Sequence, residues 1–141
     1  WTLMYGRLGH STGHILARFF GYFTILSNTL AAIAFSLWFV WPVRSIDTAA
    51  LATVCTAICV YIIIVAVIYH AVLRKTVLLQ GLDRLVNVML HSWLPAAYIL
   101  CWQFLLPKGL LSASVIPYML IFPVLYLLYA LLFGHITEHY P

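Results

Sequence analysis

Charged residues are scarce in this chain, and their scarcity argues against a soluble domain. Only 7% of the 141 residues are Asp, Glu, Lys or Arg, while 65% are hydrophobic. A soluble globular domain carries roughly 25% charged residues, because its surface must be hydrated. The composition therefore predicts an integral membrane protein.

Three other features are missing. No charged segment followed by a short apolar core opens the chain, so we identify no signal peptide. The first residue is Trp1 rather than Met, and we expect that further residues precede it. No disulfide framework is indicated, because the three cysteines all fall inside apolar runs, where we interpret them as small apolar side chains.

Long apolar runs are what the chain has instead. Four stretches lack any charge and are long enough to cross the hydrocarbon core of a bilayer as helices, namely 19–41, 49–73, 85–106 and 115–133. Short links separate them, so neighbouring helices should run antiparallel in one compact bundle. We predict an all-α fold, a polytopic transmembrane helix bundle with four spans, as a single transmembrane domain over residues 1–141.

The two sides of this bundle differ in charge. With four spans, residues 1–18, the 74–84 link and the tail from Gly134 share one side, which we call the basic side. It carries five of the seven cationic residues, which makes it cytoplasmic by the positive-inside rule. All six histidines fall on this side or in its leaflet: His10, His14, His70, His91, His135 and His139.

His91 differs from the other histidines because it lies well inside an apolar span. A titratable residue there is costly, which makes it a candidate for function facing the bundle interior. It lies seven residues past Arg84, as Thr24 lies six past Arg18, so the two side chains should share one depth.

Each of these two residues has an amide neighbour at helical spacing. Asn28 follows Thr24 by four residues, and Asn87 precedes His91 by four. Polar residues in membrane helices often serve only as interhelical hydrogen-bond partners, which is our interpretation of Ser27, Thr29 and Ser36. A hydroxyl, an imidazole and two amides at one depth favour a site. Pro95, four residues after His91, should disturb the helix there.

Four segments carry a resemblance to a known family: FGYFTILSN (20–28), IYH (68–70), DRLVNVMLHSWLP (83–95) and GHITEHYP (134–141). In these the chain resembles the androgen-induced family of integral membrane threonine hydrolases, in particular its compact bacterial relatives. The resemblance implies Thr24 as catalytic threonine and His91 as catalytic histidine. It also implies hydrolysis of fatty acid esters of hydroxy fatty acids and a bacterial plasma membrane location. The family has about six helices, so we expect one more at each end.

The chemistry of such a site can be assigned residue by residue. A threonine hydroxyl needs a base, which neutral His91 supplies, and Asn87 would orient that histidine. Because we expect mid-helix N–H groups to be bonded already, Asn28 or His70 would stabilise the oxyanion. Arg18 and Arg84 would attract a fatty carboxylate. Aromatic residues of the last span, Tyr126 among them, would line an acyl channel or form a packing stripe: Tyr118, Phe122, Tyr126, Tyr129 and Phe133.

Two other functions stay open. The segment HITEH (135–139) matches a zinc signature, and His10 and His14 form a second pair, which would suit a histidine-rich metalloenzyme. Intramembrane polar residues and helix prolines also suit a transporter or lipid-binding protein. We favour the hydrolase, with no cofactor or metal, with membrane lipids and a lipid ester as partners, and without a nucleic acid partner.

Overall fold

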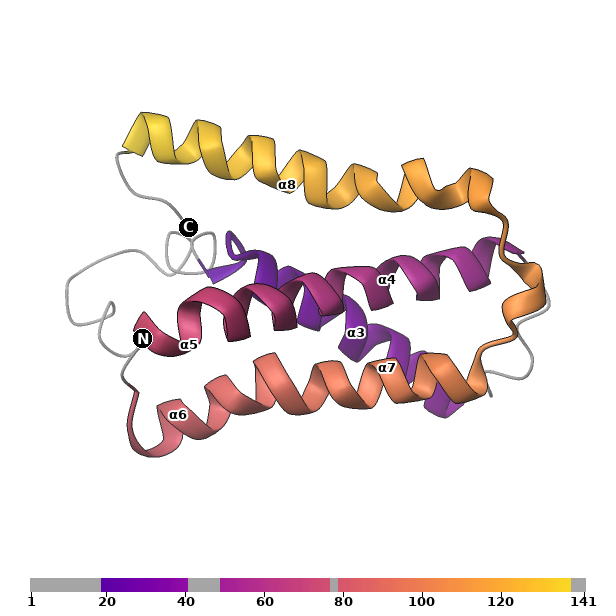
Figure 1. The fold of residues 1–141 in the computed structure, drawn as a ribbon, viewed down its shortest axis with the longest axis horizontal. Coiled ribbons are helices and arrows are strands. Elements are labelled where there is room, and N and C mark those ends of the chain that lie inside the picture. Colours follow the sequence, from indigo (N-terminus) through magenta and orange to yellow (C-terminus); the bar gives the residue numbers. More distant parts are fainter. Residues whose placement is uncertain (1–18, 41–48, 77–78, 138–141) are drawn as a thin grey trace.

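A computed structural model describes residues 19–40, 49–76 and 79–137 of the chain (Figure 1). Predictions that fall on other residues, among them Arg18, His10, His14 and His139, lie outside the described residues. The described elements are all helical, and no strand occurs among them. They are, in order, α3 (Phe23–Val40), α4 (Ala49–Ile68), η2 (Tyr69–Leu73), α5 (Arg74–Thr76), α6 (Gly81–Val88), η3 (Met89–Trp93), α7 (Leu94–Leu105), two short 3₁₀ turns (Lys108–Leu110 and Ala113–Val115) and α8 (Ile116–Thr137).

The predicted all-α fold with four spans is confirmed. In the described residues, four continuous helical segments are long and apolar enough to cross a membrane: Phe23–Val40, Ala49–Leu73, Gly81–Leu105 and Ala113–Ile136. The protein is therefore a multi-pass membrane protein. Such spans are helical because lipid offers no partner for backbone N–H and C=O groups, which must bond within the segment.

The ends of the helices differ from the ends of the apolar runs. The third helical segment begins at Gly81, four residues earlier than the apolar run at 85–106. Charge at Asp83 and Arg84 marks the edge of the apolar region and does not stop a helix, and an acidic residue in the first turn complements the helix dipole. Gly81 has a φ of 59°, a conformation that glycine adopts without steric cost.

Helix α4 lies at the centre of the bundle, packed against α3 on one side and α7 on another. Small side chains of α3, Ala31 and Ala34, let it approach Ile58 and Ile62 of α4 closely. Tyr98 of α7 is fully buried in the same cluster and donates a hydrogen bond to the Cys55 carbonyl oxygen over 3.2 Å.

Helix α8 packs less extensively than the others. Its main neighbour among the described elements is α4, along which it runs in Figure 1. Met119 of α8 is buried against Ala57 and Tyr61 of α4, with Phe122 beside them. Most other large side chains of α8 are exposed apolar groups, as expected of a helix that faces lipid.

Two of the described spans contain a π-helical segment, and these two segments carry the intramembrane histidines His70 and His91. In η2 the Arg74 N–H bonds the Tyr69 carbonyl, and in η3 the Leu94 N–H bonds the Met89 carbonyl, five residues back in each case. Pro95 lies two residues past the end of η3, where it has no N–H to donate and its ring crowds the carbonyl four residues back, that of His91. The disturbance expected at Pro95 thus takes the form of a π turn, a feature frequent at functional sites.

Candidate active site

Thr24 and His91 come together across the bundle. The Thr24 Oγ1 atom lies 3.5 Å from His91 Nε2. Thr24 is the second residue of α3 and is half-buried, while His91 is the central residue of η3 and is only 9% exposed. The two positions that stood out in the sequence therefore face a shared interior.

The other ring nitrogen of His91 decides what Nε2 can do. His91 Nδ1 lies 2.8 Å from the backbone carbonyl oxygen of Asn87. A carbonyl only accepts hydrogen bonds, so in the neutral imidazole Nδ1 carries the proton and donates it there. Nε2 is then left with its lone pair directed at the Thr24 hydroxyl. This is the tautomer that a general base requires.

Asn87 thus orients His91 through its main chain, whereas the sequence pointed to its amide. That amide is engaged elsewhere, because Asn87 Nδ2 donates to the Tyr69 hydroxyl over 2.9 Å. The Tyr69 ring in turn stacks on the His91 imidazole, with centroids 4.4 Å apart and planes 26° apart. The side chain of Asn87 therefore holds the ring that covers His91.

Tyr69 was missed at the level of sequence, although it is 6% exposed and touches both Asn87 and His91. It stands in the segment IYH, from which only His70 was selected. An aromatic residue in an apolar span carries no signal of its own, and only its position directly before a titratable residue would have pointed to it.

The hydroxyl of Thr24 behaves differently from those of Thr29 and Ser36 in the same helix. Thr29 and Ser36, which we expected to bond between helices, instead donate to carbonyls of their own helix four residues back, over 2.8 and 2.9 Å. That expectation was wrong, because a short side chain on an exposed helix face reaches its own backbone first. Thr53 and Thr56 of α4 do the same. Thr24 is directed at an imidazole on another helix.

Thr24 also lies at a helix end rather than in mid-helix as we had assumed. The first N–H groups of a helix have no acceptor within it, so those of Thr24 and Ile25 are directed toward the open end of α3. The first backbone bond entering this turn is Leu26 N–H to the Tyr22 carbonyl, at 3.1 Å. Hydrogen-bond donors thus lie beside the Thr24 side chain.

Asn28 lies one turn further along α3 and is 6% exposed. Its Nδ2 donates to the Thr24 carbonyl oxygen over 2.8 Å, which ties the amide to the residue that carries the candidate nucleophile. One amide hydrogen is used in this way, and the second stays available. Asn28 Oδ1 is buried and has no hydrogen-bond partner among the described residues, and the same holds for the hydroxyl of the neighbouring Ser27.

His70 forms a second hydroxyl–imidazole pair. Its Nε2 lies 3.1 Å from Ser92 Oγ, which links η2 to η3 next to the Thr24–His91 contact. His70 is exposed, in contrast to His91. Among the described residues Nδ1 of His70 has no hydrogen-bond partner. No described neighbour therefore determines the tautomer of His70, whereas the Asn87 carbonyl determines that of His91.

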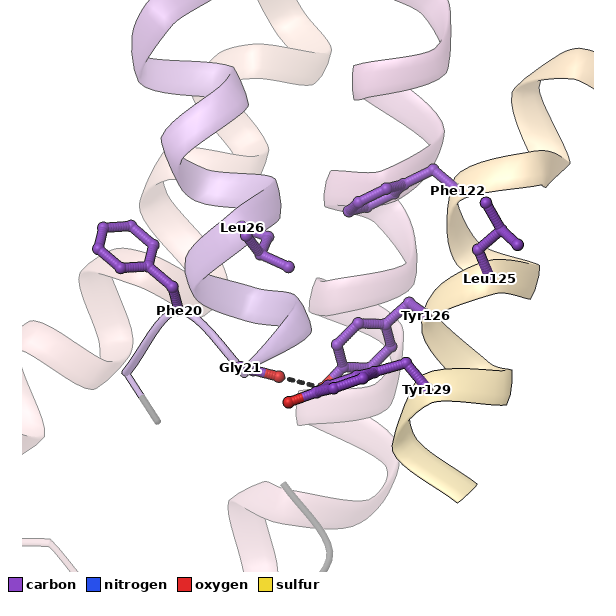
Figure 2. A pocket seen from close by; sticks show the side chains of 7 residues that line it. All are labelled: Phe20, Gly21, Leu26, Phe122, Leu125, Tyr126 and Tyr129. Atoms are coloured by element: carbon purple, nitrogen blue, oxygen red, sulfur yellow. Dashed lines mark hydrogen bonds between the residues drawn. The ribbon is translucent and has the colours of Figure 1, made fainter. Parts of the chain in front are cut away.

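Arg84 and Tyr126, which we expected to bind substrate, take no part in the hydrogen bonds of Thr24 and His91 among the described residues. Arg84 is exposed in the first turns of α6. Tyr126 of α8 donates to the Gly21 carbonyl oxygen over 2.9 Å, which links α8 to the turn that leads into α3 (Figure 2). A groove of about 340 Å³ opens there, lined by Phe20, Gly21, Leu26, Phe122, Leu125, Tyr126 and Tyr129. Neither Thr24 nor His91 is among its lining residues.

The metal signature in the tail is described only in part. His135 is exposed near the end of α8, while Glu138 and His139 lie outside the described residues. In the part of the chain that the structure describes, no three His, Cys, Asp or Glu side chains gather where they could hold a metal ion.

Comparison of the chain with protein-family models, with curated proteins and with solved structures finds no match. The geometry around Thr24 and His91 is therefore the main indication of function.

Proposed function

We propose that this protein is an integral membrane hydrolase that cleaves fatty acyl esters with Thr24 as nucleophile and His91 as base. The observation that carries the proposal is the chain of contacts from the Asn87 carbonyl to His91 Nδ1 and from His91 Nε2 to the Thr24 hydroxyl. A nucleophile, a base and a group that orients the base are the parts that nucleophilic catalysis by a hydroxyl requires. The contact of 3.5 Å suits a site without substrate, because such hydrogen bonds shorten when substrate binds.

The reaction has two steps. In the first, Thr24 Oγ1 attacks the ester carbonyl carbon while His91 Nε2 takes the hydroxyl proton. The carbon–oxygen bond to the leaving alcohol then breaks, and His91 returns the proton to that alcohol. In the second step a water molecule gives its proton to His91, its oxygen bonds the acyl carbon, and the fatty acid leaves as Thr24 recovers its proton.

Negative charge develops on the carbonyl oxygen in both steps and needs donors. The N–H groups of Thr24 and Ile25 at the open end of α3 serve this purpose, with the positive end of the helix dipole behind them. The second amide hydrogen of Asn28, whose first binds the Thr24 carbonyl oxygen, is a further donor for this oxygen. Removing one donor of this kind typically costs about 10²–10³ in rate.

The depth of the site supports a lipid substrate. His91 lies seven residues after Arg84, which marks the edge of the apolar region, and this corresponds to roughly 10 Å along the helix. An ester must enter the hydrocarbon region to reach that depth, which favours a fatty acyl ester over a soluble one. Esters of hydroxy fatty acids, with Arg84 attracting the free carboxylate, and a location in a bacterial plasma membrane complete the proposal.

Labelling with a fluorophosphonate probe for serine and threonine hydrolases tests the proposal. Purified wild-type protein in nanodiscs should be labelled, and Thr24→Ala should not be. Thr29→Ala is the matched control, because it removes a hydroxyl from the same helix that bonds only its own backbone. Equal labelling of wild type and a folded Thr24→Ala variant would refute Thr24 as the nucleophile.

A further inference from the structure

The groove between α3 and α8 has a composition suited to hydrocarbon. Its side chains are aromatic or aliphatic apart from two tyrosine hydroxyls, and none of the described residues that line it is charged. One of these hydroxyls, that of Tyr126, is already bonded to the Gly21 carbonyl. Figure 2 shows the rings of Tyr126 and Tyr129 facing the α3 end, with Phe122 deeper along α8. The groove volume of about 340 Å³ falls at the lower end of the range of small-ligand sites.

The groove lies between two membrane-spanning helices, α3 and α8. Among the described residues α8 packs mainly on α4 and makes few contacts with α3, so no close packing of these two helices fills the space between them. From Phe122 to Tyr129 the groove follows eight residues of α8, roughly 10 Å along its axis. A hydrocarbon chain that diffuses in the bilayer can enter the groove without passing through water.

The groove begins beside the candidate nucleophile. Phe23, the residue before Thr24, packs its ring on Phe122 at 5.5 Å and on Tyr126 at 5.0 Å between centroids. The first turn of α3 therefore has the groove on one side and His91 on the other. Gly21, which lines the groove, has no side chain to obstruct the path around the open end of that turn.

We propose that the α3–α8 groove binds the acyl chain of the ester whose carbonyl is attacked by Thr24. This inference rests on the proposed hydrolase function and adds the place and direction of the substrate. The chain extends from the N-terminal end of α3 along α8 toward Phe122, deeper into the membrane. Because that chain is already in hydrocarbon before it binds, the groove contributes orientation of the carbonyl more than affinity.

Filling the groove tests this assignment. Leu125 lines it and is 59% exposed, so Leu125→Trp can be introduced without disturbing the core. Leu128, on the same helix and 58% exposed, does not line it, so Leu128→Trp is the matched control. We expect Leu125→Trp to lower kcat/KM for a palmitoyl ester by about tenfold or more, since small misplacements of a reacting group cost up to about 10² in rate. The loss should be smaller for an acetyl ester, which is too short to fill the groove, and Leu128→Trp should hydrolyse the palmitoyl ester as wild type does.

A second measurement does not depend on catalysis. A palmitoyl ester with a diazirine on its chain is photolysed with Thr24→Ala protein in nanodiscs, and the modified residues are identified by mass spectrometry. Labelling should concentrate on Phe122, Leu125 and Tyr129 and should fall in Leu125→Trp but not in Leu128→Trp. Such labelling without any hydrolysis by wild type would support the groove and refute the hydrolase. Two results would overturn the groove assignment. One is uniform labelling of all lipid-facing residues of α8, and the other is palmitoyl ester hydrolysis that Leu125→Trp leaves unchanged.

Discussion

Replacing Asn87 by Ala distinguishes the two ways in which this residue could orient His91. The structure assigns the orientation to the Asn87 carbonyl, which bonds His91 Nδ1 at 2.8 Å and which alanine retains. The substitution removes only the amide, whose contact is the 2.9 Å hydrogen bond to the Tyr69 hydroxyl.

The size of the effect follows from that single contact. A hydrogen bond between neutral side chains contributes about 0.5–1.5 kcal/mol. The position of the Tyr69 ring over His91 therefore loses no more than this amount of stabilisation. Since 1.36 kcal/mol corresponds to a factor of ten in rate, kcat should fall by about tenfold at most. By contrast, substituting the side chain that fixes the histidine tautomer in a triad protease costs about 10⁴.

Ester hydrolysis in nanodiscs measures this difference, with folding checked by size exclusion. Tyr69→Phe removes the same hydrogen bond from the other side, so the two variants should be similar. Their double variant should be little worse than either alone, as expected when two substitutions remove one interaction. A folded Asn87→Ala protein with a thousandfold lower kcat would refute the reasoning and return the orienting role to the amide.

Three other predictions follow from the same site. Thr24→Ala and His91→Ala should each abolish hydrolysis, and the double variant should be little worse, because nucleophile and base act as a unit; clearly additive losses would contradict the pairing. Ser92→Ala should keep most of the activity, because its partner His70 is exposed and lacks the orienting contact of His91; loss of probe labelling in this variant, with Thr24→Ala still labelled, would make Ser92 the nucleophile. Treatment with a chelator should leave hydrolysis unchanged, and loss of activity together with a stoichiometric metal would favour the metalloenzyme.

Composition and the lengths of apolar runs were sufficient for the architecture. In lipid a polypeptide must bond its own backbone groups, so four uncharged stretches of this length specify four helices almost regardless of side-chain detail. Thr24, Asn28, Asn87 and His91 could be selected for a related reason, because polar groups are conspicuous where the surroundings are apolar.

The contacts among those residues were decided by the tertiary structure. Helices that are apolar on all sides have no amphipathic face to indicate how they are rotated, so neither the Tyr69 ring over His91 nor the position of the α3–α8 groove could be derived from sequence. The start of α3 at Phe23, which places Thr24 at an open helix end, was equally hidden within an apolar run. The π turn before Pro95 could not be derived from sequence either. It changes which side of the helix each later residue faces. Rotation, register and helix ends depend on how the spans pack, and packing is a property of the assembled bundle.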